Sequence, residues 1–564
     1  MEKKTPVQRF WGLLKPDKKE IKNVYIYAVF NGLVMLTLPL GIQSIINHIQ
    51  GGQINFAWGV LVGFVLLGVA LSGILQIHQL RIVENLQQKI FTRAAFEFAY
   101  RMPKLKLEKL FGQYAPELMN RFFDVVAVQK GLSKILIDFS TAFIQVIFGL
   151  LLLSLYHPFF IGFGLILIIL AYLIFKFTAQ AGLDSSLKES KSKYEVVHWL
   201  EELARTKLTF KLAGETDLPL RKVDKSVSGY LTFRERHFKI LMQQFSLMIV
   251  FKVMIASGLL IIGSVLVMEQ QMNIGQFVAS EIIILLILNS VEKLIQSLES
   301  IYDILTSLEK IGFVTDLEME DEGGRGDMKV SSETGVSLDI RQLYFSYPER
   351  IKPVLNNLTL NANSNESLLI FGRNDSGKAT LFKLISGLYN PQGGNISIDD
   401  MPINSYDLTY LRNDIGEYYS DDVLFEATLL ENISLGRERA TMECVKWAVK
   451  NVGLEDFIKS QPQGYQTIVT PGGFQYPRSV ITRLLLARAI AARPKLLLLR
   501  DGLATLNPVM KDEIMRFLTD KKNNWTVIFF SSNTELAKYV DNVAVMSHGF
   551  ITKKVEPSEL NNPS

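Results

Sequence analysis

The sequence predicts an α-helical membrane domain with six spans, followed by a separate α/β domain. Residues 23–80 and 139–175 contain no Asp, Glu, Lys or Arg. Because about 20 apolar residues span a bilayer, such runs exclude a purely soluble protein. Beyond residue 335, short β-branched runs alternate with helical stretches, as in an α/β domain. The whole chain of 564 residues is 48% hydrophobic and 21% charged, in keeping with this division.

The charge-free runs are too long for single helices, and they break at short polar or proline-containing segments. These breaks lie at 50–53, 156–158 and 269–273. The six expected spans cover residues 24–47, 55–78, 135–155, 159–176, 245–268 and 275–297. Within the first span, Pro39 and Gly41 predict a kink.

Lys and Arg residues are concentrated on one side of these spans. The first 22 residues carry seven, segment 81–134 carries ten and segment 176–239 carries thirteen, whereas the short connecting loops carry none. Because cytoplasmic loops are enriched in cations, the chain is expected to lie in the cytoplasmic (inner) membrane with both termini in the cytoplasm. Lys15 to Lys22 is expected to form an amphipathic elbow on the membrane surface.

The two cationic segments have a helical pattern. Residues 81–101 and 186–212 place apolar residues every three or four positions. Four spans are therefore expected to continue as long helices below the membrane, namely 55–78, 135–155, 159–176 and 245–268. Each cationic segment turns near a glycine, Gly112 in the first and Gly214 in the second.

The composition also predicts the domain boundaries. The membrane domain is expected over 1–315 and the α/β domain over 335–564. Between them, residues 316–334 are acidic and rich in glycine, which indicates a linker. One cysteine, Cys444, excludes a disulfide framework and fits a reducing compartment. The net charge of +4 is too small to indicate a nucleic-acid partner.

The strongest chemical signal is the segment FGRNDSGKAT, which ends at Thr380. It follows the apolar run 367–371 and opens a helical stretch at Lys378. A strand, a glycine-bearing loop and a helix N-terminus cradle phosphates, because backbone N–H groups and the helix dipole favour an anion. Lys378 is the residue that reaches the β- and γ-oxygens. The pattern GxxxxGK[ST] is broken at its last position, where Ala379 replaces the hydroxyl that holds Mg²⁺, although Thr380 is adjacent.

Read without gaps, residues 338–547 resemble the nucleotide-binding domain of ATP-binding-cassette (ABC) transporters. The resemblance rests on short stretches. Residues 344–348 look like the entry motif, and residues 411–416, 424–425 and 431–433 track the region around the Q-loop. Residues 486–490 match the helix after the signature, and residues 493–499 match the strand before the catalytic carboxylates. Together with the six spans, it covers nearly the whole chain. It implies an exporter-type half-transporter, with one membrane domain fused to one cytoplasmic α/β domain of the P-loop ATPase kind.

The resemblance also implies a nucleotide site and two docking elements. The aromatic ring of Tyr347 is similar to the family's adenine-stacking residue. The phosphates would lie against the loop and the helix start, formed by Gly372, Asn374, Ser376, Gly377, Lys378, Ala379 and Thr380. Segments 112–117 and 214–218 look like the coupling elements that dock on the nucleotide-binding domains.

Several residues depart from the family pattern. Ser420 stands where the family has the glutamine that senses Mg²⁺ and the γ-phosphate, and residues 476–480 (YPRSV) stand at the signature LSGGQ. The other departures are Arg500 for the aspartate that supports Mg²⁺, Asp501 for the water-polarising glutamate, and Ser532 for the switch histidine. Gly472 and Gly473 lie upstream of the signature position.

These departures predict a degenerate ATPase. Phosphoryl transfer depends on positioning and on metal-assisted charge neutralisation, and here both sets of groups are changed. We expect ATP as the cofactor, bound weakly and with little need for Mg²⁺, no metal-ligating residue, and impaired hydrolysis. Arg500 can partly replace the charge of Mg²⁺ but cannot orient water, so Asp501 is the candidate catalytic residue. An active ATPase that uses relocated oxygens of Thr380, Asp501 and Asp375 stays open.

The sequence favours an export subunit that dimerises to move a hydrophobic, lipid-like, peptide or protein substrate across the membrane. Its expected partners are a second half-transporter, in a homodimer or heterodimer, and membrane lipid, with a periplasmic adaptor as a further candidate and no nucleic acid. The alternative is a non-hydrolysing membrane scaffold or regulatory pseudo-ATPase subunit of a transport or secretion complex. Asp138, Lys252 and Glu281 are candidate substrate contacts within apolar spans, although the first two can also be hydrated near the cytoplasmic ends.

Overall fold

The computed structural model describes residues 4–50, 56–321, 334–348, 350, 352–501 and 503–559. The chain forms two compact units, one of Met1–Lys104 with Gln113–Leu317 and one of Leu105–Gly112 with Glu318–Ser564. Of the predicted linker, residues 322–333 lie outside the described residues.

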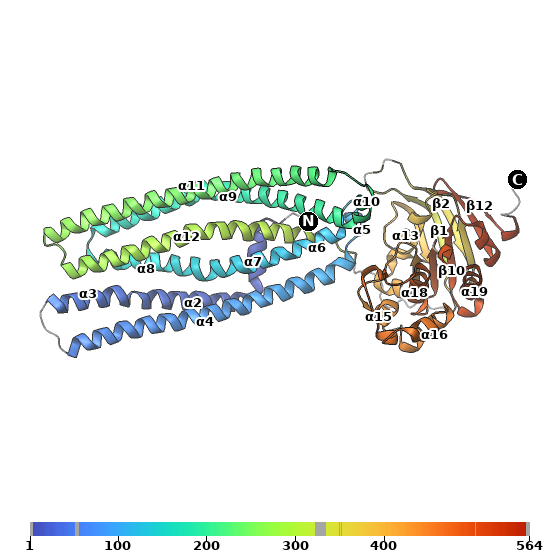
Figure 1. Cartoon of the computed structure of the whole chain (residues 1–564), viewed down its shortest axis with the longest axis horizontal. Helices are drawn as coiled ribbons and strands as arrows, with labels where there is room; N and C mark the ends of the chain where they lie inside the picture. The colour runs from blue at the N-terminus through green and yellow to red at the C-terminus, as the bar shows by residue number, and fades with distance from the viewer. Residues whose placement is uncertain are drawn as a thin grey trace. The chain divides into compact units, whose positions relative to one another are not determined.

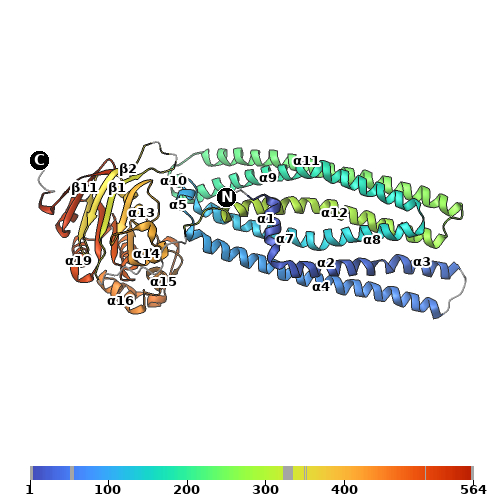
Figure 2. The same ribbon diagram turned by 180° about the vertical axis from the view of Figure 1, so that it is seen from behind.

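The first unit is built from long helices (Figures 1 and 2). Among the described residues, six helical stretches are long and apolar enough to cross a membrane. The helices of this unit are α1 (Pro6–Leu14), α2 (Lys18–Met35), α3 (Thr37–Gln50), α4 (Phe56–Arg101), α6 (Ala115–Asn120), α7 (Asp124–Ser133), α8 (Ser140–Tyr156), α9 (Phe159–Arg205), α10 (Lys207–Leu212), α11 (Leu218–Met268) and α12 (Ile274–Thr315). In both views α9 runs beside α11, and α2 beside α4.

The helices continue beyond the apolar spans, as the sequence predicts. Helices α4, α9 and α11 are uninterrupted over 46, 47 and 51 residues. Helix α8 follows α7 through a π-helical turn over Lys134–Phe139. The sequence did not predict that the sixth span also continues, to Thr315. Its buried face persists beyond residue 297, with Tyr302 and Leu308 among the side chains that are at most 5% exposed.

The first span confirms the predicted kink and corrects the predicted elbow. Helices α2 and α3 are separated at Leu36, because Pro39 has no N–H to donate to the carbonyl four residues earlier. Residues 15–22 do not form a separate elbow helix, because Lys15–Asp17 is a 3-10 turn and α2 begins at Lys18. The separate N-terminal helix is α1, which starts earlier because Thr5 and Gln8 form a capping box with Pro6 at the first helical position.

The described residues of the second unit form three sheets. A four-stranded antiparallel sheet has the order β2-β1-β4-β5, a six-stranded sheet has the order β12-β11-β3-β10-β9-β6, and β7 pairs with β8. The strands are β1 (Leu338–Phe345), β2 (Leu355–Ala362), β3 (Ser367–Phe371), β4 (Gly393–Ile398), β5 (Met401–Pro402), β6 (Ile415–Tyr419), β7 (Ala427–Thr428), β8 (Ile468–Val469), β9 (Leu496–Arg500), β10 (Thr526–Ser531), β11 (Asn542–Ser547) and β12 (Phe550–Val555).

Helices surround these sheets in the second unit. They are α5 (Leu107–Leu110), α13 (Lys378–Ile385), α14 (Leu408–Asp414), α15 (Leu429–Ser434), α16 (Met442–Asn451), α17 (Glu455–Ser460), α18 (Arg478–Ile490) and α19 (Pro508–Leu518). The strands β3, β9 and β10 are almost wholly buried Leu, Ile, Val and Phe. This pattern is typical of parallel strands that are covered on both faces. The predicted α/β architecture is therefore present.

The register of the parallel strands gathers the chain segments of interest at one edge. Phe371 pairs with Ser531, and Arg500 pairs with both Phe530 and Tyr419. The strands β3, β10, β9 and β6 thus end side by side. In an open α/β sheet, ligands bind outside the carboxyl ends of the strands.

Candidate functional site

The loop between β3 and α13 has the backbone expected of a phosphate cradle. A Cβ added to Gly372 would lie 2.5 Å from the Met546 carbonyl oxygen, so no larger residue fits there. Gly377 has a φ of +106°, which favours glycine, and is the N-cap residue of α13. The N-terminus of α13 therefore follows directly from the loop, which is the arrangement that binds an anion.

Lys378 folds back onto this loop. Its Nζ donates to the carbonyl oxygens of Gly372 at 2.6 Å and Arg373 at 2.9 Å, and lies 3.4 Å from Ser376 Oγ. Burial lowers the pKa of the Lys378 ammonium, and the nearby carboxylates of Asp501 and Asp375 oppose that shift. When a phosphate group binds, the Lys378 ammonium would thus exchange these carbonyl partners for anionic phosphate oxygens. Among the other predicted residues, Asn374 is exposed and Ser376 is buried.

The hydroxyl beside the altered position is hydrogen-bonded to another side chain. Ala379 is the second residue of α13, and the buried Thr380 Oγ1 lies 3.2 Å from the Tyr347 hydroxyl. The Thr380 hydroxyl is therefore engaged with the predicted base-binding aromatic residue. It is 5% exposed and already hydrogen-bonded in this arrangement.

At the strand edge, a cation stands where an acidic ligand is expected. Arg500 Nη2 lies 3.3 Å from Asp421 Oδ2, and Ser420 Oγ lies 3.4 Å from Asp421 Oδ1. The next residue, Asp501, has a φ of +45°, and its backbone N–H donates to the Phe530 carbonyl at 3.2 Å. Ser532, which follows β10, is exposed.

This donor set does not fit Mg²⁺. Magnesium takes oxygen ligands in near-octahedral geometry, whereas the site offers a methyl group at Ala379 and a guanidinium at Arg500. Within the described part of the chain, no group of three or more His, Cys, Asp or Glu side chains is placed to hold a metal ion. The loop and Lys378 do fit the phosphates of a nucleotide.

The helix that carries the signature position begins with unusual residues. Pro477 is the N-cap residue of α18, and Arg478 is its exposed first residue. The Tyr476 ring packs perpendicular to that of Phe457, with ring centroids 5.0 Å apart, and its hydroxyl donates a 3.2 Å hydrogen bond to Gln461. The small side chains that let a phosphate approach backbone N–H groups are therefore absent from positions 476–478.

A buried arginine on α18 organises the neighbouring loop, which sequence reasoning missed. Arg488 donates to the Asn432 carbonyl at 2.7 Å and to Asp422 at 2.8 Å. Burial lowers the pKa of Arg488, and the Asp422 carboxylate opposes that shift. Asp421 and Asp422 thus pair with two different arginines. The adjacent acids beside Ser420 were a sequence signal for these pairs.

The segment Leu105–Gly112 packs within the second unit. Leu105 is 2% exposed and bridges to Met319, and Phe111 stacks on Tyr347 with ring centroids 5.5 Å apart. The predicted docking element at 112–117 therefore begins where this packed segment ends. At the other predicted element, Gly214 has a φ of +72° and residues 211–218 are exposed.

The charged residues of the apolar spans have distinct surroundings. Lys252 forms an ion pair with Glu292, an acid within the sixth predicted span that sequence reasoning overlooked. Lys252 thus has a partner of opposite charge within the span region. Asp138 lies exposed on the π-helical turn, and Glu281 Oε1 is buried with no hydrogen-bond partner among the described residues.

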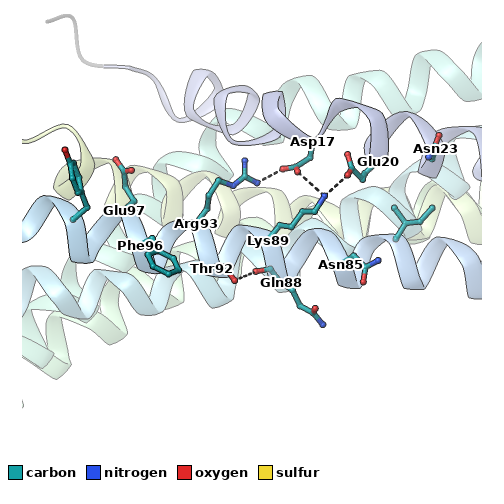
Figure 3. Close-up of a pocket in the computed structure, with 12 residues that line it drawn as sticks. Asp17, Glu20, Asn23, Asn85, Gln88, Lys89, Thr92, Arg93, Phe96 and Glu97 are labelled. Carbon is teal, nitrogen blue, oxygen red and sulfur yellow. Dashed lines mark hydrogen bonds and ion pairs between the residues drawn. The ribbon is translucent and has the colours of Figure 1, made fainter.

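A polar groove of about 1060 Å³ lies between the start of α2 and α4 (Figure 3). Lys89 points to Glu20, with Nζ 2.6 Å from Oε1, and Arg93 pairs with Asp17. These ion pairs join the two helices. We therefore assign the groove's charged residues a structural role.

Comparison with known proteins places both parts of the chain. The family model described as "ABC transporter transmembrane region" matches residues 23–291, and that described as "ABC transporter" matches residues 355–502. The structure of a bacterial Atm1-family ABC exporter with ATP bound superposes with a TM-score of 0.83 at 19% sequence identity, over 96% of each chain. This likeness concerns the fold.

Curated relatives are similar over part of their length. The alpha-hemolysin translocation ATP-binding protein HlyB is 28% identical in Escherichia coli O157:H7 and 30% identical in Proteus vulgaris, over 339 residues. The leukotoxin translocation ATP-binding protein LktB of Mannheimia haemolytica is 29% identical over 339 residues. The aligned part is 60% of this chain and 47% of each relative. The chain thus spans about half the length of the curated relatives it matches.

Proposed function

Because the chain belongs to the ABC transporter family and is an integral membrane protein with an exporter fold, we propose that it is the subunit of a polypeptide exporter whose own nucleotide site binds ATP without useful hydrolysis. It lies in the cytoplasmic membrane with both termini in the cytoplasm. The cationic segments on one side of the six spans support this orientation.

The substrate class is protein or peptide rather than lipid. The relatives that align with 60% of the chain are translocation ATP-binding proteins for alpha-hemolysin and leukotoxin. The substrates of these relatives support a polypeptide substrate, because the described apolar spans carry no distinctive substrate motif. A periplasmic adaptor remains a candidate partner.

The observation that carries the nucleotide proposal is Arg500 at the end of β9, held 3.3 Å from Asp421. Nucleotide binding itself follows from the family, and the loop Gly372–Gly377 with Lys378 supplies the phosphate contacts. The guanidinium replaces the charge that Mg²⁺ would supply, but it neither coordinates nor orients an attacking water. Loss of one catalytic group commonly lowers a rate by about 10²–10³, and such losses do not simply add.

The chain acts as a dimer with a second half-transporter. In this family each nucleotide lies between the phosphate loop of one chain and the signature of the other, so α18 would face the partner's nucleotide. Pro477 and Arg478 at the start of α18 leave that second site impaired as well. A homodimer would then have two impaired sites, and a heterodimer would depend on contacts that this chain does not supply.

Complementation in the native host tests the export proposal. We expect deletion of the chain to remove one or a few polypeptides from the medium, as measured by quantitative mass spectrometry. The wild-type chain restores them, and Lys378→Ala, produced at the same level in the membrane, does not. Restoration by Lys378→Ala would instead favour the non-hydrolysing scaffold, and unchanged secretion after deletion would contradict export.

A further inference from the structure

Segment Leu105–Gly112 contributes an aromatic ring to the predicted nucleotide site. The ring of Phe111 stacks on that of Tyr347, with centroids 5.5 Å apart and planes inclined by 20°. Stacked aromatic rings have centroid distances of about 4.5–7 Å, so no room for a base remains between these two. The face of Tyr347 toward Phe111 is already occupied.

The other neighbours of Tyr347 are fixed parts of the second unit. Phe345 and Tyr389 meet it at interplanar angles of 86° and 87°, with centroids 5.0 and 5.4 Å away. The Lys383 ammonium lies 5.7 Å from the ring centroid, and the Tyr347 hydroxyl lies 3.2 Å from Thr380 Oγ1. These contacts hold the tyrosine ring in place.

Phe111 is the neighbour that can leave. It is 38% exposed, whereas Phe345 and Tyr389 are 2% and 7% exposed. The following residue, Gly112, has a φ of +74°, and an added Cβ there would meet nothing within 4 Å. The chain at Gly112 therefore has room to move, and glycine permits backbone conformations there that other residues rarely adopt.

The other end of the segment is anchored. The Lys106 backbone N–H donates to the Glu318 carbonyl at 3.0 Å, and Lys106 Nζ lies 2.6 Å from Glu318 Oε1. Glu108 accepts a 3.1 Å hydrogen bond from the backbone N–H of Asn390. Release of Phe111 can thus occur without loss of the contacts at residues 105–108.

We propose that Phe111 and a purine base compete for the same face of Tyr347, so that nucleotide binding frees the Phe111 end of segment Leu105–Gly112. This rests on the proposed nucleotide binding and on the expectation, from the family resemblance, that Tyr347 stacks on adenine. The competition lowers nucleotide affinity and makes the position of Phe111 depend on occupancy. Phe111 thus lowers the affinity for a nucleotide whose base stacks on Tyr347.

Binding of two ligands by the full chain in detergent tests the proposal, with ATP as the base-carrying probe and inorganic tripolyphosphate as the baseless one. In isothermal titration calorimetry, Phe111→Ala should strengthen ATP binding by about three- to tenfold, the value of one aromatic stack. Phe111→Trp should weaken it by about two- to threefold, because a larger ring stacks better. Neither variant should change tripolyphosphate binding. Phe550→Ala is the matched control, because Phe550 on β12 is similarly exposed at 41%.

A Tyr347→Ala background separates the possible outcomes. The gain from Phe111→Ala should vanish there, since no ring remains for the base to occupy. Weaker ATP binding by Phe111→Ala would show that the two rings clamp the base, and equal shifts for both ligands would show an effect on the phosphate loop. Either result, or no change, overturns the competition. If neither ligand binds any variant at millimolar concentration, nucleotide binding itself fails, and the proposed function falls with the inference.

Discussion

Arg500 and Asp421 form an ion pair across the ends of two parallel strands, with Nη2 3.3 Å from Oδ2. Arg500 ends β9, and Asp421 follows β6 by two residues. The pair places a fixed cation beside the phosphate loop. It also brings the Asp421 carboxylate toward that cation.

ATP affinity should therefore depend little on Mg²⁺. We expect the dissociation constants in MgCl₂ and in EDTA to agree within about threefold, since Mg²⁺ lacks its usual protein ligands here. In the double variant Ala379→Ser/Arg500→Asp, Mg²⁺ should strengthen binding by about tenfold or more. Calorimetric titrations in the two buffers check this. Arg516→Asp, an exposed change on α19, is the control, and a strong Mg²⁺ dependence in the wild type would contradict the assignment.

Lys378 should carry much of the phosphate affinity. Charge-assisted hydrogen bonds contribute about 1.5–3 kcal/mol, so Lys378→Ala should weaken ATP and tripolyphosphate binding alike by about 10- to 100-fold. Lys459→Ala, whose side chain is 75% exposed on α17, should leave both unchanged. Unaltered tripolyphosphate binding in Lys378→Ala would show that the phosphates lie elsewhere.

The sequence was sufficient to predict the architecture because its two patterns have strong physical causes. Long runs without charge favour a membrane, and a glycine loop between a buried strand and a helix favours an anion site. The gapless resemblance also identified Arg500, whose chemistry differs most from the family pattern. The partner of Arg500 was harder to predict, because the pairing of β6 with β9 joins residues 79 positions apart in the sequence.

The Lys252–Glu292 pair should matter for stability more than for substrate. Removing one partner leaves an uncompensated charge in an apolar span, so Glu292→Gln should lower stability by about 1–3 kcal/mol. The double change Lys252→Met/Glu292→Leu should recover most of the loss. Apparent melting temperatures in detergent measure both effects. Full stability of Glu292→Gln would mean that the ion pair contributes little.

Glu417 on β6 should make the nucleotide-binding unit less stable at high pH. Burial raises the pKa of its carboxyl, while the Ser386 side chain and Arg412 oppose the shift. The native state thus holds the proton more tightly than the unfolded state. The contribution of this group to stability is therefore fully present below the ordinary pKa of about 4.5 and is lost as pH rises through the raised value. Glu417→Gln should flatten this fall in thermal unfolding of the full chain between about pH 4.5 and 8. An unchanged pH profile would contradict the raised pKa of the Glu417 carboxyl.

Two features could not be predicted from local patterns. Phe111 and Tyr347 are separated by more than two hundred residues, and an exposed phenylalanine beside a glycine looks like an ordinary turn residue. The extension of α12 to Thr315 was missed because its C-terminal half carries charged and hydroxyl side chains among the apolar ones, which hides the buried face. The start of α1 was detectable, since Thr5, Pro6 and Gln8 form a capping signal.

The measurement that tests the central claim most directly is ATP turnover by the purified full chain in lipid, with Mg²⁺ present. We predict a rate below about 0.01 s⁻¹, well under the range of about 1–10³ s⁻¹ typical of enzymes, with no difference between the wild type and Lys378→Ala. Turnover of about 1 s⁻¹ or more that Lys378→Ala abolishes would contradict the account. It would show that Asp501, or another relocated oxygen, activates water in spite of Arg500.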